Sequence, residues 1–239
     1  MSRDSLAGVR IFLSASVPDE LNKNEQKLQD RLHLISALTE QIFKKNGTLV
    51  YGGHPSVTPL IHQTAVNMLS GAKGAAASVD LFQLGGFRAQ APSQVSDLRV
   101  FPSVTWVGSH SPSQKQAFED ELDEMRKLMV RGASAAVFAG GKMHGYLGKQ
   151  PGIRREYDLF VKEHPGQPVY LVGLLDGETA KIVAENESTG AREHNGLNEA
   201  ELWALHHSDQ VDIAISLIVD DLLSYAAKKG TAGPGGASP

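Results

Sequence analysis

The sequence predicts an α/β fold, a three-layer sandwich in which helices cover both faces of a mainly parallel sheet. Short apolar runs alternate along the chain with long amphipathic stretches, as strands alternate with helices in a parallel sheet. The chain has 239 residues, of which 41% are hydrophobic and 21% are charged. This length and composition fit one large domain whose core needs neither a metal ion nor a disulfide bond.

The strands are predicted from short runs that are rich in apolar and β-branched residues. These runs cover residues 9–13, 48–51, 78–82, 103–107, 135–139 and 168–172. Most of them are separated by segments long enough to hold a crossover helix. The sequence therefore favours a sheet whose consecutive strands run parallel and are joined by right-handed crossovers.

The helices are predicted where apolar residues recur at helical spacing. They cover residues 27–45, 55–69, 113–130, 153–162 and 209–228, and two short helices are expected within residues 178–207. Asn46-Gly47 is typical of a C-cap and ends the first helix. Pro59 favours a start of the second helix near Thr58, because proline fits the first turn of a helix.

This order of strands and helices is typical of a Rossmann-like domain, which we expect over residues 1–229. Residues 230–239 contain only Gly, Thr, Pro, Ala and Ser, and we expect a disordered tail there.

Composition excludes several classes of protein. The chain has no cysteine, so disulfide bonds, thiolate catalysis and cysteine-ligated zinc are excluded, and a reducing cytoplasm is the expected compartment. The net charge of −4 argues against binding to duplex nucleic acid. No signal peptide and no apolar run of roughly 20 residues is present, so we expect no membrane association. No histidine or carboxylate spacing is typical of a metal site, and we expect neither a metal ion nor an organic cofactor.

A first glycine turn, Tyr51-Gly52-Gly53-His54-Pro55-Ser56, follows a predicted strand and opens a predicted helix. Glycines at such a turn let the backbone approach a ligand, and the helix N-terminus offers N–H groups to a phosphate. We expect ligand-binding residues at Gly52, Gly53, His54, Ser56 and Thr58. The alternative is an ordinary turn in which Ser56 or Thr58 only caps the helix.

A second glycine turn begins at Gly140-Gly141, after the strand predicted over residues 135–139, and continues to Gly152. Two glycine turns at the carboxyl ends of parallel strands predict one shared crevice, where open α/β sheets bind ligands. We therefore expect Gly140, Gly141 and Gly152 in the site, and a lid over residues 142–150. Ser14 and Ser16, which follow the first strand, are further candidates for contact with a ribose or a phosphate.

Two charged residues lie within apolar helical stripes. Arg126 is four residues after Leu122, and Glu156 is three residues after Ile153. Because burying an unpaired charge costs several kcal/mol, each must have a partner or face a polar cleft. We interpret them as the catalytic or ligand-contacting pair. The alternative is a structural ion pair, or for Glu156 a favourable acid near a helix N-terminus.

These motifs, in this order, resemble the LOG-like superfamily over residues 9–172. The resemblance rests on Ile11 to Ser16, Leu49 to Gly53, Met125 to Met129, Gly140-Gly141, Pro151-Gly152 and Glu156. The superfamily includes the LOG phosphoribohydrolases, which release a cytokinin base from its riboside monophosphate. It also includes SLOG domains, which sense or process nucleotide-derived signals such as ADP-ribose and its cyclic variants.

The chain departs from the LOG enzymes in ways that resemble the SLOG branch. A longer glycine run follows the second strand of those enzymes, where this chain has Gly52-Gly53-His54-Pro55. They also carry an uninterrupted Pro-Gly-Gly-x-Gly-Thr before paired glutamates. Here residues 142–150 interrupt that motif, Ile153 replaces the threonine, and Arg155 precedes the single Glu156.

The resemblance implies a protein that binds a nucleoside phosphate or an ADP-ribose-like ligand at the carboxyl ends of its strands. It also implies a homo-oligomer. One alternative is an N-glycosidase that acts on a nucleoside 5′-monophosphate, with Glu156 and Arg126 at the reacting bond. The other is an interaction protein with a vestigial pocket.

Overall fold

The structure, a computed structural model, describes residues 4–16, 25–70, 78–87, 100–146 and 148–231. Six strands form one sheet in the order β4-β3-β2-β1-β5-β6, and every neighbouring pair is parallel. The strands are β1 (Arg10–Ser16), β2 (Thr48–Tyr51), β3 (Ser78–Leu84), β4 (Ser103–Val107), β5 (Ala135–Gly140) and β6 (Val169–Val172).

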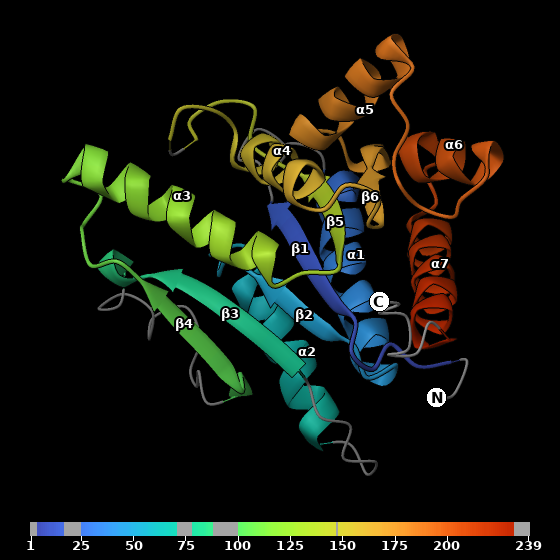
Figure 1. The fold of residues 1–239 in the computed structure, drawn as a ribbon, viewed down its shortest axis with the longest axis horizontal. Coiled ribbons are helices and arrows are strands. Elements are labelled where there is room, and N and C mark those ends of the chain that lie inside the picture. The colour runs from blue at the N-terminus through green and yellow to red at the C-terminus, as the bar shows by residue number, and fades with distance from the viewer. Residues whose placement is uncertain (1–3, 17–24, 71–77, 88–99, 147, 232–239) are drawn as a thin grey trace, which may run out of the picture.

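Helices cover both faces of this sheet, as Figure 1 shows. They are α1 (Glu25–Lys44), α2 (Thr58–Ser70), α3 (Lys115–Arg131), α4 (Gly152–Glu163), α5 (Glu178–Thr189), α6 (Glu199–His207) and α7 (Val211–Thr231). Buried side chains of α1, α2 and α7 pack on one face, and those of α3, α4 and α5 pack on the other. The predicted three-layer α/β sandwich is confirmed.

Successive side chains of β1 enter the two cores on opposite faces of the sheet. Ile11 and Leu13 belong to the core under α1, whereas Phe12 belongs to the core under α3 and α4. Because successive side chains of a strand point to opposite faces, Ser14 shares the face of Phe12. Ser14 is therefore directed toward α3 and α4, at the carboxyl end of the central strand.

The strand order reverses beside β1. The chain passes from β1 outward through β2, β3 and β4, and then crosses back to place β5 on the other side of β1. Such a reversal leaves a crevice at the carboxyl ends of the strands, because the connections on its two sides diverge. The candidate site lies at this edge of the sheet.

Sequence periodicity located the elements well. The bounds predicted for β2 and β4 are confirmed, and α2 begins at Thr58 as Pro59 indicated. Two short helices, α5 and α6, lie within residues 178–207 as expected. One expectation is corrected at its edge: α7 continues through Gly230 and Thr231, which had been assigned to the tail. The rest of that tail, residues 232–239, lies outside the described residues.

The predicted cap of α1 takes a recognisable form. Asn46 adopts a left-handed conformation with φ of 62°. The N–H of Gly47 donates to the carbonyl oxygen of Ile42, and the N–H of Asn46 donates to that of Phe43. These two bonds are the Schellman motif, with Asn46 in the position that glycine usually takes.

Candidate functional site

A cavity of about 390 Å³ opens at the carboxyl ends of β1, β2 and β3, between the N-terminal part of α4 and the middle of α3. Its lining includes eight residues that the sequence pointed to: Ser14, Ser16, Gly52, Gly53, His54, Arg126, Gly152 and Glu156. The residues predicted from the end of the first strand, from the first glycine turn and from the two charges in apolar stripes thus line the same cavity.

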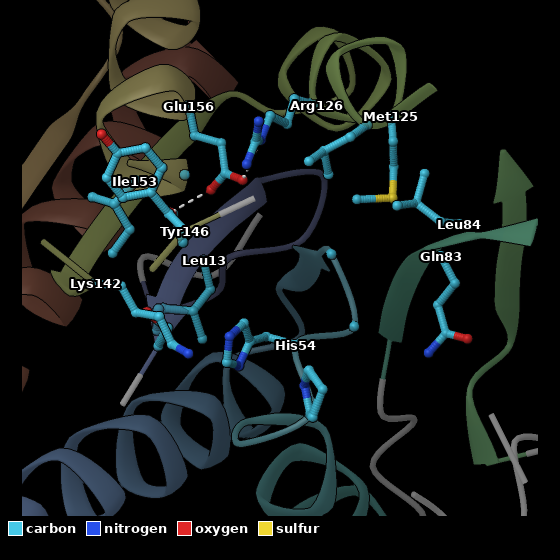
Figure 2. A pocket seen from close by; sticks show the side chains of 18 of the residues that line it. Leu13, His54, Gln83, Leu84, Met125, Arg126, Lys142, Tyr146, Ile153 and Glu156 are labelled. Carbon is cyan, nitrogen blue, oxygen red and sulfur yellow. Dashed lines mark hydrogen bonds and ion pairs between the residues drawn. The ribbon is translucent and has the colours of Figure 1, made fainter. Parts of the chain in front are cut away.

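The carboxylate of Glu156 is held on both oxygens. The Ser14 hydroxyl donates to Oε2 at 2.5 Å, and Arg126 Nε donates to Oε1 at 3.2 Å. The side chains of Arg126 and Glu156 are 10% and 16% exposed. Figure 2 shows both of them entering the cavity, with Arg126 coming from α3 and Glu156 from α4. A carboxylate that is this enclosed and held on both oxygens has a fixed position at the wall of the cavity.

The local sequence explains why this pair forms. Phe118, Leu122, Met125 and Met129 form the predicted apolar stripe of α3, so Arg126 beside Met125 is carried inward with them. Gly152 begins α4, and a Cβ atom at this position would lie 2.9 Å from Arg126 Nη2. The glycine therefore leaves room for the guanidinium against the start of α4.

The first glycine turn lines the cavity through Gly52, Gly53 and His54. Gly53 has φ of 62°, and a Cβ there would lie 2.8 Å from atoms of the Gln83 side chain. Both the backbone conformation and the space thus require glycine at this position.

Ser56 and Thr58, which were expected to hold a phosphate, do not line the cavity. The Ser56 hydroxyl is bonded to His54 Nδ1, and the buried Thr58 hydroxyl donates to the His54 carbonyl oxygen. The backbone N–H groups of Val57 and Thr58 also donate to that carbonyl. The start of α2 is therefore capped by His54 rather than directed at the cavity.

The first two glycines of the second glycine turn do not reach the cavity, although Gly152 at its end does. Gly140 and Gly141 are buried, with φ of 74° and 98°, and neither lines the cavity. The Gly141 carbonyl oxygen accepts the N–H of Glu178 at the start of α5, and the Gly141 N–H donates to the Ser16 carbonyl oxygen. A Cβ on Gly140 would lie 2.7 Å from the Ser16 carbonyl oxygen, and a Cβ on Gly141 would lie 2.8 Å from Ile153 and 3.2 Å from Glu178. These glycines therefore serve the close packing of β5 against β1, α4 and α5.

Sequence reasoning missed most of the apolar wall. Leu84 ends β3 and Phe87 follows it, Met125 comes from α3, and Lys142 and Tyr146 come from the loop before α4. The Gln83 carboxamide also lines the cavity, and its buried oxygen accepts no hydrogen bond from any described residue. Met125 had a signal only as part of an apolar stripe and of the family motif, and Lys142 and Tyr146 belong to the predicted lid over residues 142–150. Leu84, Phe87 and Gln83 had no signal in the sequence.

The arrangement offers a small molecule an apolar wall and two separate groups of polar side chains. Figure 2 places Arg126 and Glu156 at the top of the view, and His54 and Lys142 at the bottom. Cavities of roughly 300–1,000 Å³ with an apolar wall and a few fixed polar groups are typical of small-molecule sites.

None of the described helices is long and apolar enough to cross a membrane. A comparison with curated proteins finds no match. Among solved structures, the chain is similar to the X-ray structure of TM1055, a structural genomics target, with a TM-score of 0.51 and 17% identity over 88% of this chain and 98% of that one. This likeness concerns the fold alone. The model of the SLOG cluster3 family matches residues 9–209, so the chain belongs to the SLOG cluster3 family.

Proposed function

We propose that this protein binds a nucleotide-derived ligand, a nucleoside phosphate or an ADP-ribose-like molecule, in the cavity at the carboxyl ends of β1, β2 and β3. The observation that carries the proposal is the carboxylate of Glu156, fixed by Ser14 and Arg126 at the wall of that cavity. Membership of the SLOG family supports a nucleotide-related ligand.

Glu156 suits the hydroxyl groups of a ribose. An ionised carboxylate has about four lone-pair sites, and Ser14 and Arg126 occupy two of them. The remaining sites can accept hydrogen bonds from two neighbouring hydroxyls. Because the carboxylate is already held in place, the ligand meets it without an entropic cost of ordering the side chain.

The phosphate end of the ligand is assigned to the first glycine turn. Gly53 brings the backbone to the cavity without a side chain, and His54 and Lys142 supply nitrogen donors nearby in the lining. Lys142 belongs to the loop before α4, so a phosphate bound there would also hold this loop against the site. This assignment leaves out Ser56 and Thr58, whose hydroxyls are bonded to His54 and do not line the cavity.

The base is assigned to the apolar wall. Leu84, Phe87, Leu122, Met125 and Ile153 provide surface on which a flat ring can pack.

The same observation supports a second candidate, an N-glycosidase that acts on a nucleoside 5′-monophosphate. A fixed carboxylate beside a ribose can stabilise the positive charge that develops as the glycosidic bond breaks, or activate the attacking water. Arg126 would then hold the carboxylate in its orientation through the hydrogen bond to Oε1.

A thermal-shift screen with AMP, ADP-ribose and the cyclic ADP-ribose isomers tests the proposal. A ligand present at one hundred times its Kd stabilises the folded state by about 2.7 kcal/mol. Glu156→Gln should lose this stabilisation, because the variant cannot accept both ribose hydroxyls as an anion does. Arg155→Gln is the matched control, since it breaks an ion pair to Asp123 between the same two helices, and neither Arg155 nor Asp123 lines the cavity.

Chromatography of the same mixtures distinguishes the candidates. Release of free base by the wild type and not by Glu156→Gln would identify a glycosidase, whereas stabilisation without base release would identify a binding protein. No stabilisation by any of these ligands would contradict both, and would favour an interaction protein with a vestigial pocket.

A further inference from the structure

A cluster of histidine and glutamate side chains lies outside the cavity, where the C-terminal ends of α5 and α6 meet. Glu187 is in the last turn of α5, and His206 and His207 end α6. One ligand atom from each of the three lies within 4.8 Å of the others. None of these residues lines the cavity, so the cluster is independent of the function proposed above.

The orientation of His206 is fixed by a buried carboxylate. His206 Nε2 lies 2.6 Å from Glu193 Oε1, and the Glu193 side chain is 3% exposed. The other oxygen of Glu193 accepts the backbone N–H of Leu171 at 3.1 Å, so the carboxylate is itself anchored to β6. When the carboxylate accepts a hydrogen bond from Nε2, the proton of the neutral ring is on Nε2. The lone pair that can bind a metal ion is then on Nδ1.

That Nδ1 faces the other two side chains. His206 Nδ1 lies 3.5 Å from Glu187 Oε1, and His207 Nε2 lies 2.8 Å from the same oxygen. Ligands at 2.0–2.1 Å from a tetrahedral zinc ion are separated by roughly 3.3 Å. The two separations from Glu187 lie on either side of this spacing, and the Glu187 and His207 side chains, which are 49% and 39% exposed, can move to meet it.

The surroundings also favour a cation. The last carbonyl groups of a helix carry partial negative charge, and both α5 and α6 end at this cluster. Two imidazoles with one carboxylate are a typical zinc-binding set, which leaves a fourth position for water. A carboxylate hydrogen-bonded to the outer nitrogen of a ligand histidine is the usual support of such a site.

We propose that Glu187, His206 and His207 bind a divalent transition-metal ion of the zinc class, with Glu193 as a positioning residue. The ion ties the end of α5 to the end of α6, and its open position is exposed to solvent.

Calorimetric titration of the full-length protein with Zn²⁺ tests the site. His207→Gln and Glu187→Gln should each weaken the binding of Zn²⁺ at least tenfold, because each removes a direct ligand. His33→Gln is the matched control: His33 is also a surface histidine paired with a carboxylate, that of Asp212, and this variant should bind Zn²⁺ like the wild type. If His207→Gln binds as the wild type does, or if His33→Gln loses as much affinity, the site is refuted.

The tryptophan at the cluster gives a second readout. Trp203 is 63% exposed, and its ring centroid lies 5.8 Å from that of His207. The other tryptophan, Trp106, is on β4 at the opposite edge of the sheet from β6. In a Trp106→Phe background, Cu²⁺ should quench the Trp203 emission, and EDTA should restore it. His207→Gln should raise the Cu²⁺ concentration needed for half-maximal quenching at least tenfold. Equal quenching with and without His207 would overturn the proposal.

Glu193→Gln separates the positioning role from a structural one. Loss of such a supporting carboxylate typically weakens metal binding by 10–100-fold. The melting temperature of the metal-free variant is measured alongside, and Zn²⁺ affinity is compared under conditions in which both proteins are folded. Unchanged Zn²⁺ affinity in the folded variant would contradict the role assigned to Glu193.

Discussion

Replacing Glu156 with Gln distinguishes a functional pair from a structural one. Breaking a fully buried ion pair costs about 3–5 kcal/mol, because a charge is left without hydration, whereas an exposed pair contributes about 0–1 kcal/mol. The Arg126 and Glu156 side chains are 10% and 16% exposed and border a cavity of about 390 Å³. Water in that cavity can hydrate the guanidinium, so we expect the free energy of unfolding to fall by roughly 1–2 kcal/mol, between these two limits.

Chemical denaturation measures this loss, and a thermal melt should show a decrease of roughly 2–8 °C. Arg126→Gln and the double variant complete a cycle that isolates the coupling between the two side chains. A loss of 3–5 kcal/mol in either single variant, with affinity for AMP and ADP-ribose retained by the folded protein, would refute the functional interpretation. The pair would then be an ordinary structural ion pair.

Substitutions at three further positions test other parts of the reasoning. Asn46→Ala should lower the free energy of unfolding by about 1 kcal/mol and Asn46→Gly should not, because residue 46 is left-handed; urea denaturation measures both. The side-chain hydrogen bond from Arg155 holds the pKa of Asp123 at about 2, so this carboxylate stabilises the fold above its ordinary pKa of 3.8 and loses that effect as the pH falls toward 2. Stability measured between pH 5 and pH 3 should therefore fall less in Asp123→Asn than in the wild type, and an equal fall would contradict the assignment. Gly152→Ala should leave the melting temperature nearly unchanged and should weaken AMP binding about tenfold, because the new Cβ displaces the flexible end of Arg126. Calorimetry measures the affinity for AMP. An unchanged affinity would show that binding does not depend on the position of the guanidinium.

Local pattern was sufficient to predict the elements of the fold. Apolar runs of strand length and helical stripes depend on nearby residues, so β2, β4 and the start of α2 were located from the sequence alone. The misplaced charges Arg126 and Glu156 were informative for the same reason: a charge in an apolar stripe needs a partner, and the structure brings these two into contact.

The rest of the site depends on packing between distant segments. Gly140 and Gly141 have the composition of a ligand-binding turn, but their positive φ angles serve the close approach of α5 and β1. Gln83 and Met125 reach the cavity because β3 and α3 lie beside the ends of β1 and β2, a consequence of strand order rather than of local pattern.

The cluster on α5 and α6 escaped prediction in the same way. Glu187 precedes His206 by nineteen positions, and a loop lies between them. No single helix or turn would bring two residues at this spacing into contact. Only the packing of α6 beside β6, with Glu193 between them, directs the two imidazoles toward Glu187.

A crystal structure of the protein with ADP-ribose or AMP, whichever gives the larger thermal stabilisation, is the most direct test of the proposed function. We predict ligand density in the cavity, with a ribose hydroxyl within about 3 Å of the Glu156 carboxylate and a phosphate beside Gly53 and His54. Density outside this cavity, or a ligand whose phosphate rather than ribose lies against Glu156, would contradict the account.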